Sequence, residues 1–475
     1  MSIYLVVLKN ILRSEDYFLG LHPVIHPNND SEQMKDITLY SNDIAYSAEL
    51  NLPYSKSIVN RMLIIQALCG KVATLDPFSV SDDIETLADL LQFKTHRLNA
   101  GPAGTVMRFM TALLAQREGE WELDGSERMR ERPIKVLVDA LNDLGGELTY
   151  LGKAGFPPLL IRGKRLQGGT IKPNASVSSQ YISALLLVAP YMREGLTVEL
   201  TGTVVSLPYI EMTVMLMQRF GADVSFHPLP DAPDVHSAHS APPEQLNTDP
   251  DGAPSGHTYI IKVKPKPYSA LHLPIETDWT GASYFYELLA VLGKGHFKLS
   301  GLREKSLQGD AQQVALWEQM GVSTAFVEGG VLISANGNTC PHFTCDFRKM
   351  PDLVQSFVVA CCLKGICFDI SGIETLRYKE TDRVQALVSE LLKLGYPLSI
   401  HDNTLLWQGE RTHPPTPPTS STPPQVVIET YNDHRMAMAF SIAAVQFPGL
   451  VISDSEVVNK SFPRYWEELG KVLHP

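Results

Sequence analysis

The apolar and polar positions follow a pattern that recurs along the chain. An apolar run with helical spacing ends at a glycine, and a short alternating, strand-like run follows, at Gly145, Gly221, Gly321 and Gly395; a last helical run ends at Gly470. Glycine is favoured just after a helix because it adopts the left-handed conformation that reverses the chain there. The pattern therefore predicts helix ends at all five glycines and strands after the first four.

The spacing of these glycines predicts repeated units. They lie about 75 residues apart, except for a longer interval between Gly221 and Gly321 that contains residues 227–257. A unit of that length can hold two helices and about four strands. The chain is therefore predicted to consist of repeated α/β units.

Three segments fall outside the repeat. Residues 227–257 and 409–425 are rich in proline and polar residues, so we expect surface loops, with a docking site for a partner as the alternative. Residues 1–33 precede a strand-like run and are interpreted as a peripheral extension. Their deletion is expected to leave folding and activity intact.

Composition limits the class of protein. A chain of 475 residues is long for one core, which predicts two domains. The net charge of −12 argues against a nucleic-acid partner but not against small anions held by a local cluster of cations. No apolar run is long enough to span a membrane, and residues 1–8 lack the features of a signal peptide, so we expect a cytoplasmic protein. The six cysteines are then expected to be free thiols, because disulfides are rare in cytosolic proteins, and the pair Cys340 and Cys345 has no second pair to complete a metal site.

Several short polar runs directly precede apolar helices. Lys56 and Ser57 lie at a predicted helix N-terminus, where exposed N–H groups favour an anion, and Arg61 follows one turn later. Gly104 lies in a Gly-rich turn that allows a ligand to approach the backbone. The alternatives are an ordinary capped helix and an ordinary turn.

Further runs offer anion anchors and neutral donors. Arg132 belongs to a segment with three arginines, of which one could grip a carboxylate or phosphate while the others are solvated. Ser178, Ser179 and Gln180 supply more donors than a helix cap needs.

The cationic positions are accompanied by two carboxylates. The cations are Lys56, Arg61, Arg132, Lys379, Arg383, Arg435 and Lys460, and the carboxylates are Asp352 and Glu380. This set predicts proton transfer within a cationic site that binds ligands with several negative charges. Because the sequence lacks HExxH and Ser-His-Asp signatures, we expect neither metal-dependent nor covalent catalysis and no cofactor.

The ordered motifs resemble those of the EPSP synthase family of enolpyruvyl transferases, from about Met34 to the C-terminus. They are Ser176-Val177-Ser178-Ser179-Gln180, Leu207-Pro208-Tyr209-Ile210, Lys379-Glu380-Thr381-Asp382-Arg383, Tyr431-Asn432-Asp433-His434-Arg435-Met436-Ala437-Met438 and Lys460-Ser461-Phe462-Pro463. The resemblance implies an α/β fold of two similar domains, each an inside-out α/β barrel of three βαβαββ units, with the active site in the interdomain cleft. It suggests one domain at residues 55–275 and another made of residues 1–54 and 276–475.

The resemblance also implies a reaction and its residues. The enolpyruvyl group of phosphoenolpyruvate would move to the 5-hydroxyl of shikimate 3-phosphate by addition and elimination. Asp352 would act as base on the hydroxyl, Glu380 would handle the proton at the methylene carbon, and Lys56 is a candidate acid. Shikimate 3-phosphate would be bound by Lys56, Ser57, Arg61, Ser178, Ser179, Gln180, Ser206, Tyr209, Asp352 and Lys379. Phosphoenolpyruvate would be bound by Lys56, Gly104, Arg132, Gln180, Arg383, Arg435 and Lys460.

Four positions depart from the family pattern. Tyr54 stands where the family has Gly, Pro102 and Thr375 where it has Asn, and Phe109 where it has Pro. Two alternatives remain: a transferase acting on a UDP-sugar, disfavoured by the motifs, and a catalytically impaired relative that only binds a ligand. With the charged set intact, we expect an active monomer whose partners are the two small substrates, without nucleic acid or membrane.

Overall fold

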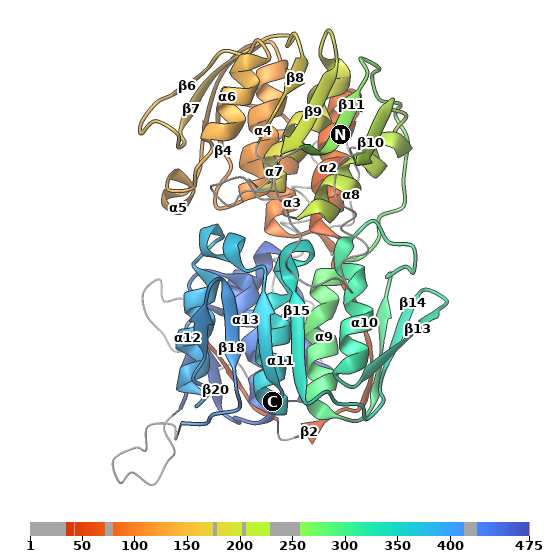
Figure 1. Cartoon of the computed structure of the whole chain (residues 1–475), viewed down its shortest axis with the longest axis vertical. Coiled ribbons are helices and arrows are strands. Elements are labelled where there is room, and N and C mark those ends of the chain that lie inside the picture. The colour runs from red at the N-terminus through yellow and green to blue at the C-terminus, as the bar shows by residue number, and fades with distance from the viewer. Residues whose placement is uncertain are drawn as a thin grey trace, which may run out of the picture.

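The computed structural model describes residues 35–41, 43–71, 79–173, 178–201, 206–228, 257–412 and 425–474. The predicted extension at residues 1–33 and most of the predicted loops at 227–257 and 409–425 lie outside these ranges. The described chain forms two halves stacked along the long axis (Figure 1). The upper half runs from α2 to β11, and the lower half contains β1 to β3 and everything from α9 to the C-terminus.

Each half has its own hydrophobic core. One core consists of side chains between Ile58 and Tyr268, joined by Leu307. The other consists of Leu50, Leu52 and side chains between Trp279 and Leu473. The predicted domain boundaries at 54/55 and 275/276 stay a prediction, which this division of the cores supports.

Four four-stranded sheets share one topology. In each, the first strand of the unit pairs in parallel with the second, the fourth lies antiparallel beside the second, and the third occupies the edge. In the upper half these are β4 (Arg97–Asn99), β5 (Gly119–Asp124), β6 (Leu148–Tyr150) and β7 (Leu159–Gly163), then β8 (Gly169–Ile171), β9 (Leu196–Thr201), β10 (Val224–Pro228) and β11 (His257–Val263). In the lower half they are β3 (Ser47–Leu50), β12 (His296–Ser300), β13 (Val322–Val327) and β14 (Gly330–Ala335), then β15 (His342–Asp346), β16 (Cys367–Ser371), β17 (Ser399–His401) and β18 (Thr404–Trp407).

Strands from both ends of the chain form two further sheets. β1 (Ile37–Leu39) lies antiparallel to β20 (Leu450–Ile452), which pairs in parallel with β19 (Val427–Ile428). β2 (Asp43–Ile44) pairs with β21 (Leu473–His474). The two ends of the described chain are thus joined within the lower half.

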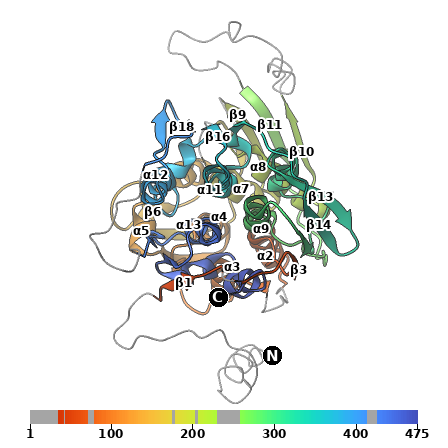
Figure 2. The same ribbon diagram turned by 90° about the horizontal axis from the view of Figure 1, so that it is seen from below.

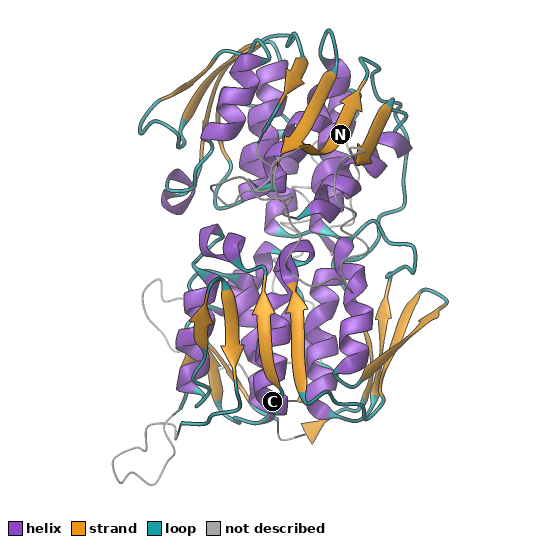
Figure 3. Cartoon of the chain, viewed as in Figure 1, coloured by secondary structure: helices purple, strands orange, loops and turns teal. Residues whose placement is uncertain are grey.

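The helices lie inside and the sheets outside, as the view from below shows (Figures 2 and 3). The upper helices are α2 (Lys56–Leu68), α3 (Asp82–Leu90), α4 (Gly104–Gln116), α5 (Glu127–Arg130), α6 (Lys135–Asp143), α7 (Ser179–Val188) and α8 (Leu207–Arg219). The lower ones are α9 (Trp279–Leu292), α10 (Gln313–Gln319), α11 (Val354–Lys364), α12 (Arg383–Lys393), α13 (His434–Ser441) and α14 (Tyr465–Gly470). α7, α9 and α11 are apolar on nearly every face, which is the pattern of a helix buried all round. Within the described ranges, no helix is both long and apolar enough to cross a lipid bilayer.

The predicted helix ends are confirmed at all five glycines, and the left-handed conformation at four of them. Gly145, Gly221, Gly321 and Gly395 have φ of 96°, 83°, 98° and 86°, and each follows the last turn of a helix. The predicted strands after them are β6, β10, β13 and β17. Gly470 differs only in conformation, because it is the last residue of α14 itself rather than a left-handed residue beyond it.

The chain passes between the halves at two adjacent points. Tyr54 forms an isolated antiparallel bridge with Thr277. Ser55 N donates to Glu276 O at 3.0 Å, and Asp278 N donates to Pro53 O at 2.9 Å. The outgoing and returning segments therefore form a short paired connection, and α2 begins directly after it.

Candidate functional site

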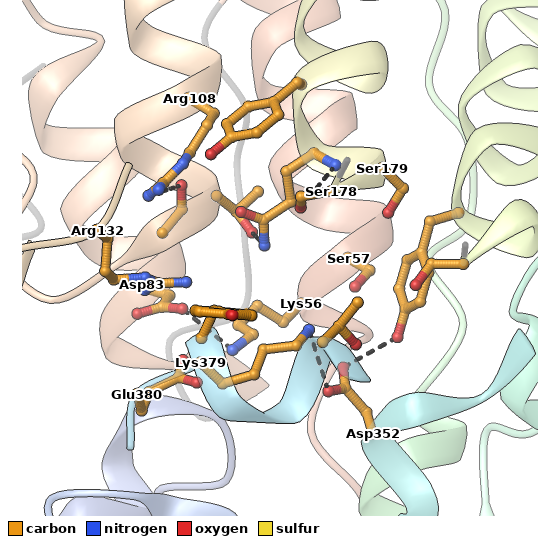
Figure 4. A pocket seen from close by; sticks show the side chains of 18 of the residues that line it. Lys56, Ser57, Asp83, Arg108, Arg132, Ser178, Ser179, Asp352, Lys379 and Glu380 are labelled. Atoms are coloured by element: carbon orange, nitrogen blue, oxygen red, sulfur yellow. Dashed lines mark hydrogen bonds and ion pairs between the residues drawn. The ribbon is translucent and has the colours of Figure 1, made fainter. Parts of the chain in front are cut away.

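A cavity of about 330 Å³ lies between the two halves (Figure 4). Its wall comes from both halves, and most of the residues that line it have polar or charged side chains. The lining residues are Lys56, Ser57, Arg61, Asp83, Gly104, Thr105, Arg108, Arg132, Pro133, Lys135, Val136, Ser178, Ser179, Gln180, Tyr181, Ser206, Tyr209, Asp352, Thr375, Tyr378, Lys379, Glu380, Arg383, His434 and Arg435.

Helix N-termini supply much of this wall. Lys56, Gly104 and Ser179 are the first residues of α2, α4 and α7, and Arg383 and His434 are the first residues of α12 and α13. The N-terminus of a helix carries free N–H groups and the positive end of the helix dipole. The location of these helix starts explains why short polar runs precede apolar helices in the sequence, and it favours anionic ligands.

Asp352 is held by groups from both halves. Its Oδ1 lies 3.0 Å from Arg383 Nη1 and 3.7 Å from Lys379 Nζ. Its Oδ2 lies 3.0 Å from Arg435 Nη2 and accepts a hydrogen bond of 3.0 Å from the Tyr209 hydroxyl of the upper half. Burial alone would raise the pKa of Asp352, but the neighbouring cations, Arg435 first, outweigh burial and hold that pKa well below its usual range.

Glu380 is the second carboxylate of the cavity. Its Oε1 lies 2.9 Å from Lys460 Nζ, and its Oε2 lies 3.1 Å from Arg383 Nη2. Burial opposes ionisation here too, but Lys460, Arg383 and Arg132 hold the pKa of Glu380 well below its usual range. The carboxylate is therefore ionised in this environment.

Arg383 connects the two carboxylates. Its Nη1 binds Asp352 and its Nη2 binds Glu380, while its Nε donates to Asp433 Oδ2 at 2.7 Å. Asp433 is fixed in turn, because it caps α13 by accepting from Arg435 N at 2.9 Å. A single guanidinium thus sets the separation and orientation of both acids.

The anion anchors of the upper half have fewer charged partners. Arg61 is bound by neutral oxygens: Nε donates to Thr213 Oγ1 at 2.7 Å, Nη1 to Ser57 O at 2.8 Å and Nη2 to Ser183 Oγ at 3.1 Å. Arg132 Nε is buried without a hydrogen-bond partner in the described part of the chain. Both arginines also line the cavity, where a ligand can contact them.

Gly104 and the Ser178 segment complete the upper wall. A Cβ at Gly104 would lie 2.7 Å from Arg132 Nη2, so only glycine leaves this guanidinium in place. Ser178 caps α7, and Gln180 Nε2 donates to Thr105 Oγ1 at 3.3 Å.

The structure brings the predicted site residues together. Fifteen of the sixteen line the cavity, from Lys56 to Arg435, and the remaining one, Lys460, contacts it through Glu380. Their assignment to individual substrates and steps stays a prediction.

Ten lining residues lie outside the predicted set, among them Asp83, Thr105, Arg108 and His434. Asp83 lies 3.1 Å from Lys56 Nζ, and His434 is buried with neither ring nitrogen hydrogen-bonded by a described residue. Thr105 and Arg108 belong to the first turns of α4. His434, Thr105 and Arg108 lie in or beside the predicted motifs, and only Asp83 lies apart from them.

His434 is uncharged in this environment. Burial, reinforced by Lys56 and Arg435, moves the pKa of His434 well below its usual range. The ring can therefore accept or donate a hydrogen bond to a bound ligand without adding charge.

The four departures from the family pattern have distinct locations. Tyr54 forms the bridge to Thr277. The carbonyl of Pro102 accepts from Lys460 Nζ at 3.3 Å, a backbone contact that does not need the usual side chain. Phe109 lies under the Arg61 guanidinium, 5.4 Å from ring centroid to Cζ, and Thr375 Oγ1 is buried at the cavity without a described partner.

Among the described residues, no group of three or more His, Cys, Asp or Glu side chains is arranged to hold a metal ion. The described cysteines are all free thiols.

Comparison with known proteins identifies the family. The sequence profile described as EPSP synthase (3-phosphoshikimate 1-carboxyvinyltransferase) matches residues 91–251 and 244–469. The chain belongs to the EPSP synthase family. The predicted resemblance is thereby confirmed.

Curated members of the EPSP synthase family match most of the chain. A 3-phosphoshikimate 1-carboxyvinyltransferase from Bacteroides fragilis is 40% identical over 425 residues, covering 89% of this chain and 95% of the relative. The enzyme of the same name from a Nostoc species is 34% identical and covers 90% of this chain and 96% of the relative. The one from Vibrio cholerae is 31% identical and covers 92% of this chain and 100% of the relative.

A solved EPSP synthase confirms the predicted two-domain α/β fold. The enzyme from Acinetobacter baumannii superposes with a TM-score of 0.65 at 18% identity, covering 92% of this chain and 98% of that one.

Proposed function

We propose that this chain transfers the enolpyruvyl group of phosphoenolpyruvate to the 5-hydroxyl of shikimate 3-phosphate and releases phosphate. Membership of the EPSP synthase family supports the class of reaction. The observation that carries the proposal for this chain is the pair of carboxylates, Asp352 and Glu380, held by Arg383 in a cavity whose lining also contains several lysines and arginines.

The cationic wall suits two anionic substrates. Clustered cations offset the repulsion between a phosphate ester and phosphoenolpyruvate, so the two can be held close enough to react. For shikimate 3-phosphate we propose Lys56, Ser57, Arg61, Ser178, Ser179, Gln180, Ser206, Tyr209, Asp352 and Lys379. For phosphoenolpyruvate we propose Lys56, Gly104, Arg132, Gln180, Arg383, Arg435 and Lys460.

Asp352 is the proposed base for the attacking hydroxyl. Before substrates bind, the cations around Asp352 weaken it as a base, since they lower its pKa. When substrate anions bind Arg435 and Lys379, their negative charge offsets part of the effect of these cations on Asp352. The basicity of Asp352 then rises in the complex in which a base is needed.

Glu380 and Lys56 are the proposed proton-transfer groups at the methylene carbon. Lys460 and Arg383 fix the Glu380 carboxylate from two directions. Lys56 approaches from the upper half and is oriented by Asp83. Addition to phosphoenolpyruvate protonates the methylene carbon and elimination removes a proton again, so one acid–base group near that carbon can serve both steps.

Release of phosphate from phosphoenolpyruvate by the purified protein tests the proposal. Release is expected only with shikimate 3-phosphate present. Asp352→Asn and Glu380→Gln should each lower turnover by roughly 10²- to 10⁴-fold, the usual contribution of a general acid or base. Asp369→Asn is the matched control, because it changes a partly exposed aspartate outside the cavity. It should leave turnover unchanged. If a folded wild-type protein releases no phosphate, the proposed reaction is wrong and the impaired-relative alternative gains support.

We further propose that the enzyme acts as a monomer in the cytoplasm. All residues proposed to bind the substrates belong to one chain, so the site is complete without a second copy. Sedimentation velocity at micromolar concentration tests the monomer.

A further inference from the structure

Arg128 reaches from the upper half to the backbone of a proposed catalytic residue. It belongs to α5, which projects from the upper half toward the lower one (Figure 1). Its Nε donates to the carbonyl oxygen of Glu380 at 3.3 Å, across 252 residues of sequence. The predicted substrate contacts leave this arginine without a role.

The accepting carbonyl is not otherwise committed to secondary structure. Glu380 precedes Asp382, the N-cap of α12, so its carbonyl stands outside the hydrogen-bonding pattern of that helix. The Glu380 carboxylate is fixed by Lys460 and Arg383, both from the lower half. Among the described residues, Arg128 is therefore the contact by which the upper half holds the Glu380 backbone.

Arg128 also forms a local ion pair. Its Nη1 lies 2.8 Å from Glu131 Oε2, three residues later in the same half. This pair is about half exposed, and exposed pairs of this kind add little to stability. The pair restricts the guanidinium without requiring the lower half.

Other contacts cross the cleft, but they involve proposed substrate-binding side chains or backbone atoms. The Tyr209 hydroxyl donates to Asp352, and Lys460 donates to Pro102 O. Ser206 N donates to Arg348 O at 3.0 Å, which joins two backbones. Arg128 differs because its side chain can be removed without removing a proposed substrate ligand.

We propose that Arg128 is a positioning residue that couples the approach of the two halves to the placement of the Glu380 carboxylate. The inference rests on the proposed function, in which Glu380 transfers a proton. When the halves meet, Arg128 holds the Glu380 backbone while Lys460 and Arg383 hold its carboxylate. When they part, the backbone contact is lost and the carboxylate is less well placed.

Steady-state kinetics of Arg128→Ala test this inference, with Arg130→Ala as the matched control. Arg130 lies on the same helix, is about equally exposed and pairs with Asp124, but it has no described contact with the lower half. Arg128→Ala is expected to lower kcat about tenfold with little change in the KM for phosphoenolpyruvate, because misplacement of a proton-transfer group acts on the chemical step. Arg130→Ala should keep kcat within about twofold, and Arg128→Lys should recover part of the loss.

Small-angle scattering measures the change in radius of gyration when substrates bind, which loss of an exposed charge alone would not alter. Addition of shikimate 3-phosphate and phosphoenolpyruvate is expected to reduce the radius of gyration less in Arg128→Ala than in Arg130→Ala. Equal kcat values in the two variants, whether both high or both low, would overturn the inference while leaving the proposed function standing. A wild-type protein without shikimate-dependent phosphate release would instead overturn the proposed function, and with it the role of Glu380 assumed here.

Discussion

Arg61 is a buried cation whose hydrogen bonds all go to neutral oxygens. Burial lowers the pKa of Arg61 to about 10, although the guanidinium remains charged at neutral pH. The rings of Phe109 and Tyr209 lie 5.4 Å and 6.0 Å from its Cζ. Aromatic faces attract cations, so these rings offset part of the cost of burying a charge without a carboxylate. Phe109, a departure from the family pattern, is thus packed against a proposed substrate ligand.

Replacing Phe109 by leucine should weaken binding of shikimate 3-phosphate. A desolvated cation–π contact is worth about 1–2 kcal/mol, which corresponds to a rise in the KM for shikimate 3-phosphate of roughly 5- to 30-fold. Phe109→Tyr keeps the ring and serves as control. An unchanged KM in Phe109→Leu would show that the ring only fills the core.

Glu287 is a carboxyl group buried in the lower core. It lies on α9 with no exposed surface, and neither carboxyl oxygen has a described hydrogen-bond partner. Desolvation raises the pKa of Glu287 well above its usual value, so the folded state holds this group protonated. The unfolded chain releases that proton above a pH of about 4.3.

Glu287→Gln should therefore stabilise the protein more at high pH than at low pH. The folded wild type binds one more proton than the unfolded chain, so its stability falls as pH rises from the unfolded pKa toward the raised folded pKa. Between the two pKa values, the free energy of unfolding of the wild type falls by about 1.4 kcal/mol per pH unit. Glutamine does not titrate, so the variant lacks this decrease. Thermal midpoints of both proteins at about pH 5.5 and about pH 7.5, both above the unfolded pKa, measure it. A difference in midpoint that is the same at both pH values would contradict the assignment.

The helices show which site residues can be predicted from local sequence and which cannot. The polar runs at Lys56 and Ser178 indicated helix starts, because helix caps follow from local sequence, and the number of cations in such runs indicated an anion-binding site. Asp83 could not be found this way: three acidic residues lie in the first turn of α3, where carboxylates commonly stabilise a helix. Only the packing of α3 against α2 brings one of them to Lys56.

Helix ends show the same limit. Gly321 and Gly470 occupy equivalent places in the sequence pattern, yet only Gly321 adopts a positive φ. The two sites differ in the neighbouring structure, because β13 begins directly after Gly321, whereas α14 continues through Gly470. The sequence repeat therefore predicts the position at which a helix ends, but not the backbone conformation of the glycine at that end.

Alanine at these two glycines should have opposite effects. A Cβ at Gly321 would lie 2.7 Å from Asn338 O at a φ of 98°, so Gly321→Ala should destabilise the protein by about 1–2 kcal/mol. Gly470 is helical and has no described atom within 4 Å of an added Cβ. Gly470→Ala should be neutral or stabilise by up to about 1 kcal/mol. Thermal unfolding of the two variants checks both signs, and equal destabilisation would be inconsistent with the different helix ends.

The molecule as a whole consists of two cores joined by one paired connection, with the cavity between them. The family resemblance implied this arrangement, whereas the glycine spacing alone indicated repeated units without saying how they are grouped. Grouping depends on contacts between distant segments, such as Tyr54 with Thr277, that a local pattern does not contain.

Truncation from the N-terminus should separate the predicted extension from the fold. Deletion of residues 1–33 is expected to leave the thermal midpoint unchanged. Deletion of residues 1–40 removes β1, which covers one edge of β20, and should lower the midpoint by several degrees. Equal midpoints for the two truncated proteins would show that β1 is dispensable.

The pairing of both chain ends has a consequence for folding during synthesis on the ribosome. β3 pairs with β12, 249 residues later at the Ser47–His296 pair, and β2 pairs with β21, at the end of the described chain. The upper core needs almost nothing beyond Tyr268, so it can fold while the N-terminal strands are still unpaired. Long-range strand pairing is slow, and unpaired strand edges favour aggregation. A nascent chain that has not yet reached β12 should therefore have a folded upper half while β3 remains unpaired and prone to aggregation.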